Sequence, residues 1–261
     1  MTIADLTYFN KTEFLNKETK FLKKHNLVKL KSSKDLIIEV PYSTTNNFCH
    51  CQIYSHPFIY LHRDAYDNLQ KVISEASKLA LKIKIWDGFR PFEAQSFMAD
   101  KYPQMVEGGY VSHPKNGIAT HVRGIAVDLT LVDHQNNELD MGTYFDEMNE
   151  KAHHNTSDLS EVQKKNRQIL IELMTQKADF ELYDNEWWHY NLKIFQRNKN
   201  NEIHQALPLQ DKIYPKITEP FTELLSSEVQ EFYNHYGQNY HFNHRSIFKR
   251  IFNKITKNLK K

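Results

Sequence analysis

The sequence is poor in cysteine, in net charge and in long apolar runs, and each scarcity excludes a class of protein. Only Cys49 and Cys51 occur in 261 residues, too few for a disulfide framework, so we expect free thiols within a strand. A net charge of +2 provides no field that favours nucleic acid. No run of about 18 apolar residues occurs, so no membrane-spanning helix is expected.

The N-terminal region also lacks the apolar segment of a secretory signal peptide, because residues 1–30 carry many lysines and glutamates. We therefore expect a cytoplasmic protein. A hydrophobic content of 40% and a charged content of 25% are typical of a globular chain, which at this length holds a sizeable core.

Hydrophobic periodicity predicts an alternation of helices and short strands. Residues 1–34 form a polar helical segment, and residues 53–61 form an extended aromatic stretch. Strands are expected at 36–40, 83–86, 125–132 and 189–192, and helices at 67–81, 93–101, 157–177 and 223–236. Ser157 or Ser160 is the expected N-cap of the third helix.

The character of the chain changes near residue 208, which predicts a main domain over 1–207 and a helical basic extension over 208–261. The last 18 residues, 244–261, hold seven lysines or arginines and no acid, with an apolar face at helical spacing. Such a helix suits weak contact with an anionic membrane surface or a partner protein. It also suits packing on its own domain with a lysine-rich solvent face, and we favour packing.

The stretch from Thr120 to Asp128 carries the first chemical signal, with His121 and Asp128 on either side of Gly124. The apolar run that follows Gly124 is typical of a buried strand, and its period-2 alternation places Asp128 among small neighbours where a ligand has room. His121 has the opposite parity. A turn at Gly124 is therefore needed to bring the imidazole and the carboxylate together.

A second cluster, Glu186-Trp187-Trp188-His189-Tyr190, supplies another imidazole and another carboxylate. His121, Asp128 and His189 would make three protein ligands with one open position, the arrangement of a catalytic zinc. Glu186 would be the general base. Because positions 186 and 189 point to opposite sides of an ideal strand, a turn or bulge must lie between them.

Arg90 follows a predicted strand and an Asp-Gly turn, so it is presented at the strand's end. Zinc on such ligands lowers the pKa of a bound water to about 7. Amide hydrolysis also needs positive charge where the oxyanion develops, and Arg90 would supply it. From the residues alone, a zinc peptidase is the function we expect.

Four segments, Trp86-Asp87-Gly88-Phe89-Arg90-Pro91, residues 121–131, Phe145-Asp146-Glu147-Met148 and residues 186–190, resemble the zinc D-alanyl-D-alanine dipeptidases of the wider D,D-peptidase clan. The resemblance runs from about residue 40 to residue 192. It implies the α+β, Hedgehog-like zinc fold of that clan, with a central antiparallel sheet, flanking helices and zinc in a cleft. It also implies hydrolysis of the dipeptide D-Ala-D-Ala to two D-Ala, in cell-wall dipeptide metabolism.

The resemblance assigns roles residue by residue. His121, Asp128 and His189 match the ligands of one zinc ion per chain, Glu186 matches the catalytic base, and Arg90 matches the arginine that stabilises the transition state.

On the substrate side, Asp146 matches a carboxylate that holds the substrate ammonium, and Tyr42 resembles a tyrosine of the substrate pocket. The family often has serine two positions before the first zinc histidine. This chain has Ala119 there, and Thr120 keeps a hydroxyl beside it.

Two alternatives remain open. A D,D-carboxypeptidase would trim peptidoglycan stem peptides, which requires an open cleft and export, and the missing signal peptide counts against it. A non-catalytic zinc-binding module would keep the fold without the chemistry, but it would need neither Glu186 nor Arg90.

Overall fold

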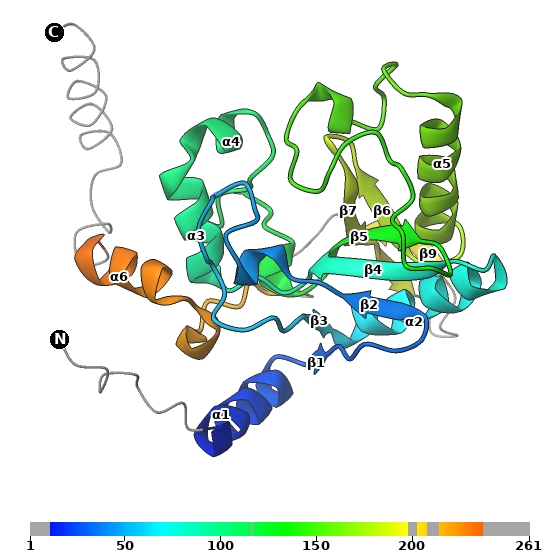
Figure 1. Cartoon of the computed structure of the whole chain (residues 1–261). Coiled ribbons are helices and arrows are strands. Elements are labelled where there is room, and N and C mark those ends of the chain that lie inside the picture. Colours follow the sequence, from blue (N-terminus) through cyan, green and yellow to red (C-terminus); the bar gives the residue numbers. More distant parts are fainter. Residues whose placement is uncertain (1–10, 116, 198–202, 208–213, 237–261) are drawn as a thin grey trace, which may run out of the picture.

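The computed structural model describes residues 11–115, 117–197, 203–207 and 214–236, and its centre is a five-stranded sheet (Figure 1). The strand order is β2 (Leu36–Ile38), β4 (Lys82–Asp87), β5 (Ala126–Val132), β7 (Glu186–Leu192) and β6 (Phe180–Tyr183). All neighbours are antiparallel except β2 and β4, which run parallel. The expected α+β class is confirmed, with an edge strand that makes the sheet mixed.

Two helices pack against the sheet and against each other: α2 (Arg63–Lys78) on β4, and α5 (Glu161–Thr175) on β5 and β6. Figure 1 shows α3 (Phe92–Lys101) and α4 (Pro103–Glu107) at the other side of the sheet from α5. Val127, Leu129 and Leu131 of β5 belong to the hydrophobic core, whereas Asp128 lines a cavity. The predicted parity of this strand is therefore confirmed.

Capping side chains set where the helices begin. The prediction for α2 was four residues late, because His62 accepts a hydrogen bond from the backbone N–H of Asp64 and starts the helix at Arg63. Ser160 rather than Ser157 caps α5, in a reciprocal capping box with Gln163.

Smaller elements complete the fold. The predicted N-terminal helical segment is α1 (Lys11–Lys24) followed by β1 (Leu27–Lys29), which pairs with β3 (Tyr60–His62). The aromatic stretch 53–61 is thus mostly irregular, with a strand only at its end. The hairpin of β8 (Ile194–Arg197) and β9 (Ile203–Leu207) was not predicted.

Cys49 and Cys51 are free and buried, as expected, but they lie in turns rather than in a strand. The side chain of Asn47 explains the turn, since it donates to the carbonyls of Pro41, Thr44 and Cys51 and accepts from the N–H of Cys49.

Residues 214–236 pack on the main body of the chain. Leu225 bridges Tyr54, and the N–H of Ile217 donates to the carbonyl of Val122. This pairing interrupts the predicted helix 223–236, which begins as α6 only at Ser227. The proposed basic helix 244–261 lies outside the described residues.

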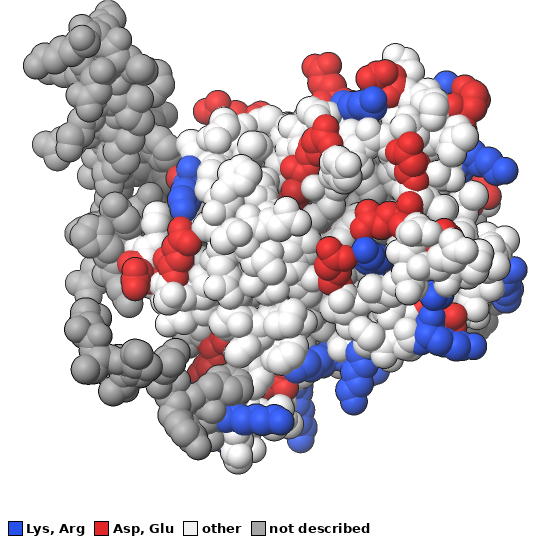
Figure 2. All heavy atoms as spheres, in the orientation of Figure 1, with Lys and Arg blue, Asp and Glu red and all other residues white. Residues whose placement is uncertain are grey.

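Charge is distributed without a dominant sign. Acidic and basic side chains are interspersed over much of the face in Figure 2, and the middle of that face carries few charges. Within the part of the chain that the structure describes, no helix has both the length and the apolar content needed to cross a membrane.

Candidate metal and substrate site

His121 lies in a 3-10 helix, His121–Arg123, that ends at Gly124 just before β5. Gly124 has a φ of 69°, in the left-handed region, and a Cβ there would lie 2.8 Å from Leu27 Cδ2 and 3.0 Å from the backbone nitrogen of His62. Glycine alone fits this conformation and this space. The predicted turn at Gly124 is confirmed, and it directs His121 towards β5.

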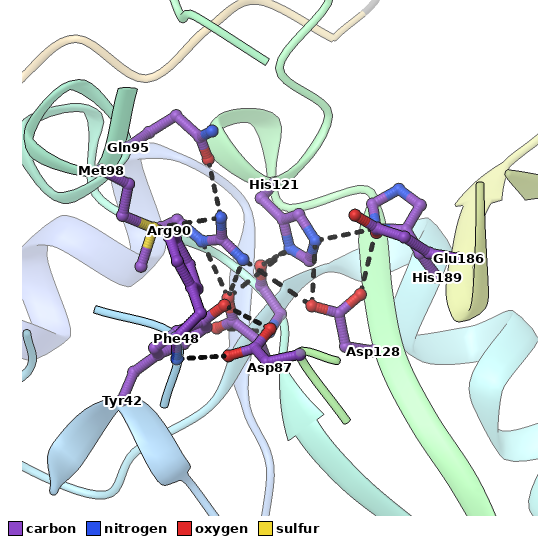
Figure 3. A network of polar contacts seen from close by, with 12 residues as sticks. Tyr42, Phe48, Asp87, Arg90, Gln95, Met98, His121, Asp128, Glu186 and His189 are labelled. Atoms are coloured by element: carbon purple, nitrogen blue, oxygen red, sulfur yellow. Dashed lines mark hydrogen bonds and ion pairs between the residues drawn. The ribbon is translucent and has the colours of Figure 1, made fainter. Parts of the chain in front are cut away.

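Asp128 and His189 are directly opposed across the antiparallel pair β5 and β7. His189 Nδ1 lies 3.0 Å from Asp128 Oδ1 and 3.1 Å from His121 Nε2, and His121 Nε2 lies 3.3 Å from Asp128 Oδ2. Figure 3 shows the three side chains converging. All three are buried, and one ligand atom from each lies within 4.8 Å of the others. Two imidazole nitrogens and a carboxylate at this spacing fit a single metal ion.

Each imidazole is oriented by a partner on its far nitrogen. His121 Nδ1 donates to the carbonyl oxygen of Gly88 at 2.6 Å, and His189 Nε2 donates to Asn191 Oδ1 at 2.9 Å. When both imidazoles are neutral, these bonds direct the lone pairs of His121 Nε2 and His189 Nδ1 towards the position between the three side chains; when an imidazole is protonated, the same nitrogen donates to Asp128. The tautomers thus suit metal binding.

Asp128 is ionised in this arrangement. Burial alone would raise its pKa, but the charges and hydrogen bonds of His121 and His189 more than offset burial and hold the pKa of Asp128 well below its ordinary value.

Glu186 begins β7, and a register shift against β6 supplies the predicted irregularity between positions 186 and 189. Tyr183 pairs with Glu186, whereas Leu182 pairs with Tyr190. Glu186 Oε2 consequently lies 3.8 Å from His189 Nδ1. Burial, with the negative charges of Asp128 and Asp146, raises the pKa of Glu186 well above its usual value.

Arg90 extends from the end of β4 into the same network (Figure 3). A bulge at Trp86 brings Asp87 opposite Asp128. Arg90 Nε and Nη2 donate to Asp87 Oδ2 at 2.9 and 2.8 Å. Arg90 Nη1 donates to Gln95 Oε1 at 3.1 Å, and Nη2 lies 3.7 Å from Asp128 Oδ2. The guanidinium is therefore buried, charged and fixed beside the metal-ligand cluster.

Asp146 lines the same cavity. Tyr42 donates from its hydroxyl to Asp146 Oδ1 at 3.0 Å, and the N–H of Phe48 approaches Asp146 Oδ2 at 3.5 Å. Burial, followed by the charge of Asp128, raises the pKa of Asp146 to about 7, although Arg90 and these hydrogen bonds act against the rise. A carboxylate of this kind is poised to ionise when a cation arrives.

One cavity of about 580 Å³ contains all the predicted site residues. Its lining includes Tyr42, Arg90, Thr120, His121, Asp128, Asp146, Glu186 and His189. Ala119 also lines it, with a φ of 48°, so the departure from serine faces the cavity directly.

Sequence reasoning did not identify four groups that orient the site residues: Asp87, the Gly88 carbonyl, Gln95 and Asn191. Asn191 was within reach of prediction, since it lies two positions after His189 on a strand and shares its face. Asp87 is three residues before Arg90 within the quoted Asp-Gly-Phe-Arg motif. The Gly88 carbonyl is a backbone atom, for which no sequence signal exists.

A buried cluster of two histidines and an aspartate, flanked by a glutamate of raised pKa and a fixed arginine, defines a metal-dependent hydrolase. The comparisons specify the family. A family model described as D-ala-D-ala dipeptidase matches residues 22–206, and the chain belongs to that family.

Curated relatives agree. A D-alanyl-D-alanine dipeptidase of Escherichia coli is 37% identical over 158 residues, covering 60% of this chain and 79% of the relative. One of Enterococcus faecium is 34% identical, covering 49% and 70%. A solved structure of the vancomycin-resistance D,D-dipeptidase VanXYg in complex with a D-Ala-D-Ala phosphinate analog matches at 17% identity and a TM-score of 0.28, covering 64% of this chain and 66% of that one.

Proposed function

We propose that this protein hydrolyses D-Ala-D-Ala to two molecules of D-Ala with one zinc ion per chain. The observation that carries the proposal is the convergence of His121, Asp128 and His189 in one cavity, with Glu186 Oε2 3.8 Å from His189 Nδ1. The membership of the D-ala-D-ala dipeptidase family supplies the substrate.

His121 Nε2, His189 Nδ1 and the Asp128 carboxylate would hold the zinc ion. When bound, zinc supplies a Lewis acid that polarises the scissile carbonyl and makes a water acidic enough to react near neutral pH. The three ligands are preorganised for this task, since Gly88 and Asn191 already fix both imidazoles.

Glu186 takes a proton from the attacking water and delivers it to the amine that leaves. Burial and the charges of Asp128 and Asp146 raise its pKa, which makes its carboxylate a stronger base than that of an exposed glutamate. Its position at the bulge of β7 places the carboxylate beside the cluster rather than on the other face of the strand.

Arg90 stabilises negative charge as it develops on the carbonyl oxygen. Asp87 and Gln95 hold its guanidinium without reorganisation during the reaction. Its net positive charge persists, because the nearby carboxylates raise its pKa more than burial lowers it.

Asp146 holds the ammonium group of the dipeptide. The hydroxyl of Tyr42 donates a hydrogen bond to the Asp146 carboxylate and thereby orients it. Thr120 faces the same cavity and offers a hydroxyl to the substrate. The two buried, free thiols of Cys49 and Cys51 suit a reducing compartment, and we place the activity in the cytoplasm.

The test is hydrolysis of D-Ala-D-Ala by the purified full chain, with metal content measured in parallel, for the wild type and Glu186→Gln. We expect about one zinc ion in both proteins, cleavage by the wild type, and a loss of about 10²–10⁴-fold in kcat in the variant. A wild type that binds zinc but cleaves only a stem peptide ending in D-Ala-D-Ala would favour the carboxypeptidase. One that binds zinc and cleaves neither would favour the non-catalytic module.

A further inference from the structure

The loop that presents Asp146 adopts an unfavourable backbone conformation at its functional residue. Asp146 has a φ of 62°, in the left-handed region. For a residue other than glycine this costs on the order of 1 kcal/mol and persists only where the surroundings enforce it. The loop has no helix or strand between Met141 and Asn149. Short-range backbone bonds, such as the one from the N–H of Met148 to the carbonyl of Asp146, fold it locally, and side chains from other elements attach it to the rest of the protein.

Arg167 of α5 holds both ends of this loop. Its Nε donates to the carbonyl of Met141 at 2.7 Å, Nη1 donates to that of His153 at 2.8 Å, and Nη2 donates to that of Lys151 at 2.9 Å. The side chain is buried, with only 3% of its surface exposed, and burial lowers its pKa to about 10. A guanidinium withdrawn from water to bind three carbonyls pins the loop on either side of Asp146.

Two further side chains on the same face of α5 bind the chain beside Met141, where the loop begins. Gln163 donates to Asp140 Oδ2 and Asn166 to the carbonyl of Asp140, each at 2.9 Å. Positions 163, 166 and 167 share one helix face because they are three and four residues apart.

A further contact lies nearer to Asp146. Trp187 Nε1 donates to Thr143 Oγ1 at 2.8 Å, and the Arg167 guanidinium lies 5.9 Å from the centre of a Trp187 ring. Arg167 and the neighbouring Trp187 therefore together contact both ends of the loop and Thr143 within it.

We propose that Arg167 is a positioning residue that sets the geometry of Asp146 and thereby the preference for substrates with a free ammonium group. The proposal rests on the proposed function, in which Asp146 binds that group. Arg167 touches neither substrate nor metal in this account and acts only through the loop.

The experiment compares the full-length wild type with Arg167→Lys and Arg167→Met, using D-Ala-D-Ala and N-acetyl-D-Ala-D-Ala as substrates. A lysine has one ammonium group and cannot reach three carbonyls, and methionine removes all the donors. We expect KM for the free dipeptide to rise about tenfold with kcat within threefold of wild type. The preference for the free over the acetylated dipeptide should fall by a similar factor.

Leu170→Ala is the matched control, because Leu170 is fully buried on the same helix but has an apolar side chain without donors. It should lower Tm while leaving KM and the substrate preference unchanged. If the arginine variants fail to fold, Thr143→Val is the replacement test, because it removes the hydrogen bond from Trp187 to the loop. It should raise KM for the free dipeptide about threefold. If the variants that fold lower Tm but match Leu170→Ala in KM and preference, Arg167 is only structural.

Asp146→Asn separates this inference from the function on which it rests. If Asp146→Asn lowers the preference for the free dipeptide and the Arg167 variants do not, the positioning proposal alone is overturned. If Asp146→Asn leaves the preference unchanged, the ammonium anchor is wrong and the positioning proposal falls with it.

Discussion

The two sides of the cavity are built in different ways. On the metal side, Asp128 and His189 project from paired strands. His121 lies in the short 3-10 helix that ends at Gly124, just before β5. On the substrate side, Asp146 projects from an irregular loop with a positive φ. The ladder of the sheet fixes the first side, whereas the second depends on side chains from other elements. We infer that the residues for metal binding are positioned by regular secondary structure. The residue for substrate selection, Asp146, is positioned by a loop that other elements hold in place.

The carboxylates differ accordingly. The pKa of Asp128 is held low by two imidazoles, so its carboxylate is ionised near neutral pH, as the proposed ligand role requires. The pKa values of Glu186 and Asp146 are raised by burial, so both respond to a cation. Three acids in one cavity thus have separate tasks because their environments differ.

Removal of a ligand should have the largest effect and should act on the metal side alone. His121→Ala loses one of three donors, so we expect zinc content to fall well below one per chain and kcat/KM to fall by about three orders of magnitude or more. Elemental analysis with steady-state kinetics measures both. His56→Ala, at a partly buried histidine outside the cavity lining, is the control. Full zinc content in His121→Ala would contradict the ligand assignment.

Arg90→Lys sharpens the comparison within the metal side. Lysine keeps the charge but loses the fork that Asp87 and Gln95 hold, so kcat should fall about 10²-fold with zinc content unchanged. A rise in KM with an unchanged kcat would instead assign Arg90 to substrate binding. The metal side would then not be limited to the chemical step.

The pH dependence of substrate binding tests the substrate side. Asp146 has a pKa of about 7, so as pH falls below that value it becomes protonated and loses its attraction for the ammonium group. We expect kcat/KM to fall up to tenfold per pH unit on the acid side of this pKa. In Asp146→Asn, the part of the acid-side fall in kcat/KM that is due to titration of residue 146 should be absent. An unaltered acid limb in that variant would exclude Asp146 as its source.

Asn191→Ala should have the smallest effect. It removes the acceptor of the His189 Nε2 proton and leaves all three ligands in place. We expect the Kd for zinc to rise about tenfold, measured by competition with a chelator, and kcat at saturating zinc to stay within a few-fold. An unchanged Kd would show that the ladder of β5 and β7 alone orients His189.

The sequence predicted most of the metal side, because its signals are local. Strand parity placed Asp128, a glycine indicated the turn after His121, and the spacing from Glu186 to His189 required an irregularity that β7 has. The parallel pairing of β2 was beyond reach, since it depends on contacts distant in sequence.

The substrate side was predicted only through family resemblance. Nothing in the periodicity of residues 141–148 indicates the conformation of Asp146, because the groups that contact this loop, such as Tyr42 and Arg167, are distant in sequence. The role of residues 214–236 as packed structure was also hidden, since pairs such as Leu225 with Tyr54 join distant parts of the chain. The division at residue 208 and the role of 244–261 stay predictions.

The most direct test of this division is a side-by-side measurement of kcat and KM for D-Ala-D-Ala in Glu186→Gln and Asp146→Asn, each loaded with zinc. We predict that Glu186→Gln lowers kcat by about 10²–10⁴-fold with little change in KM, and that Asp146→Asn raises KM about ten- to a hundredfold with kcat nearly unchanged. If both variants show the same pattern, the two sides of the cavity do not have separate tasks and the account is wrong.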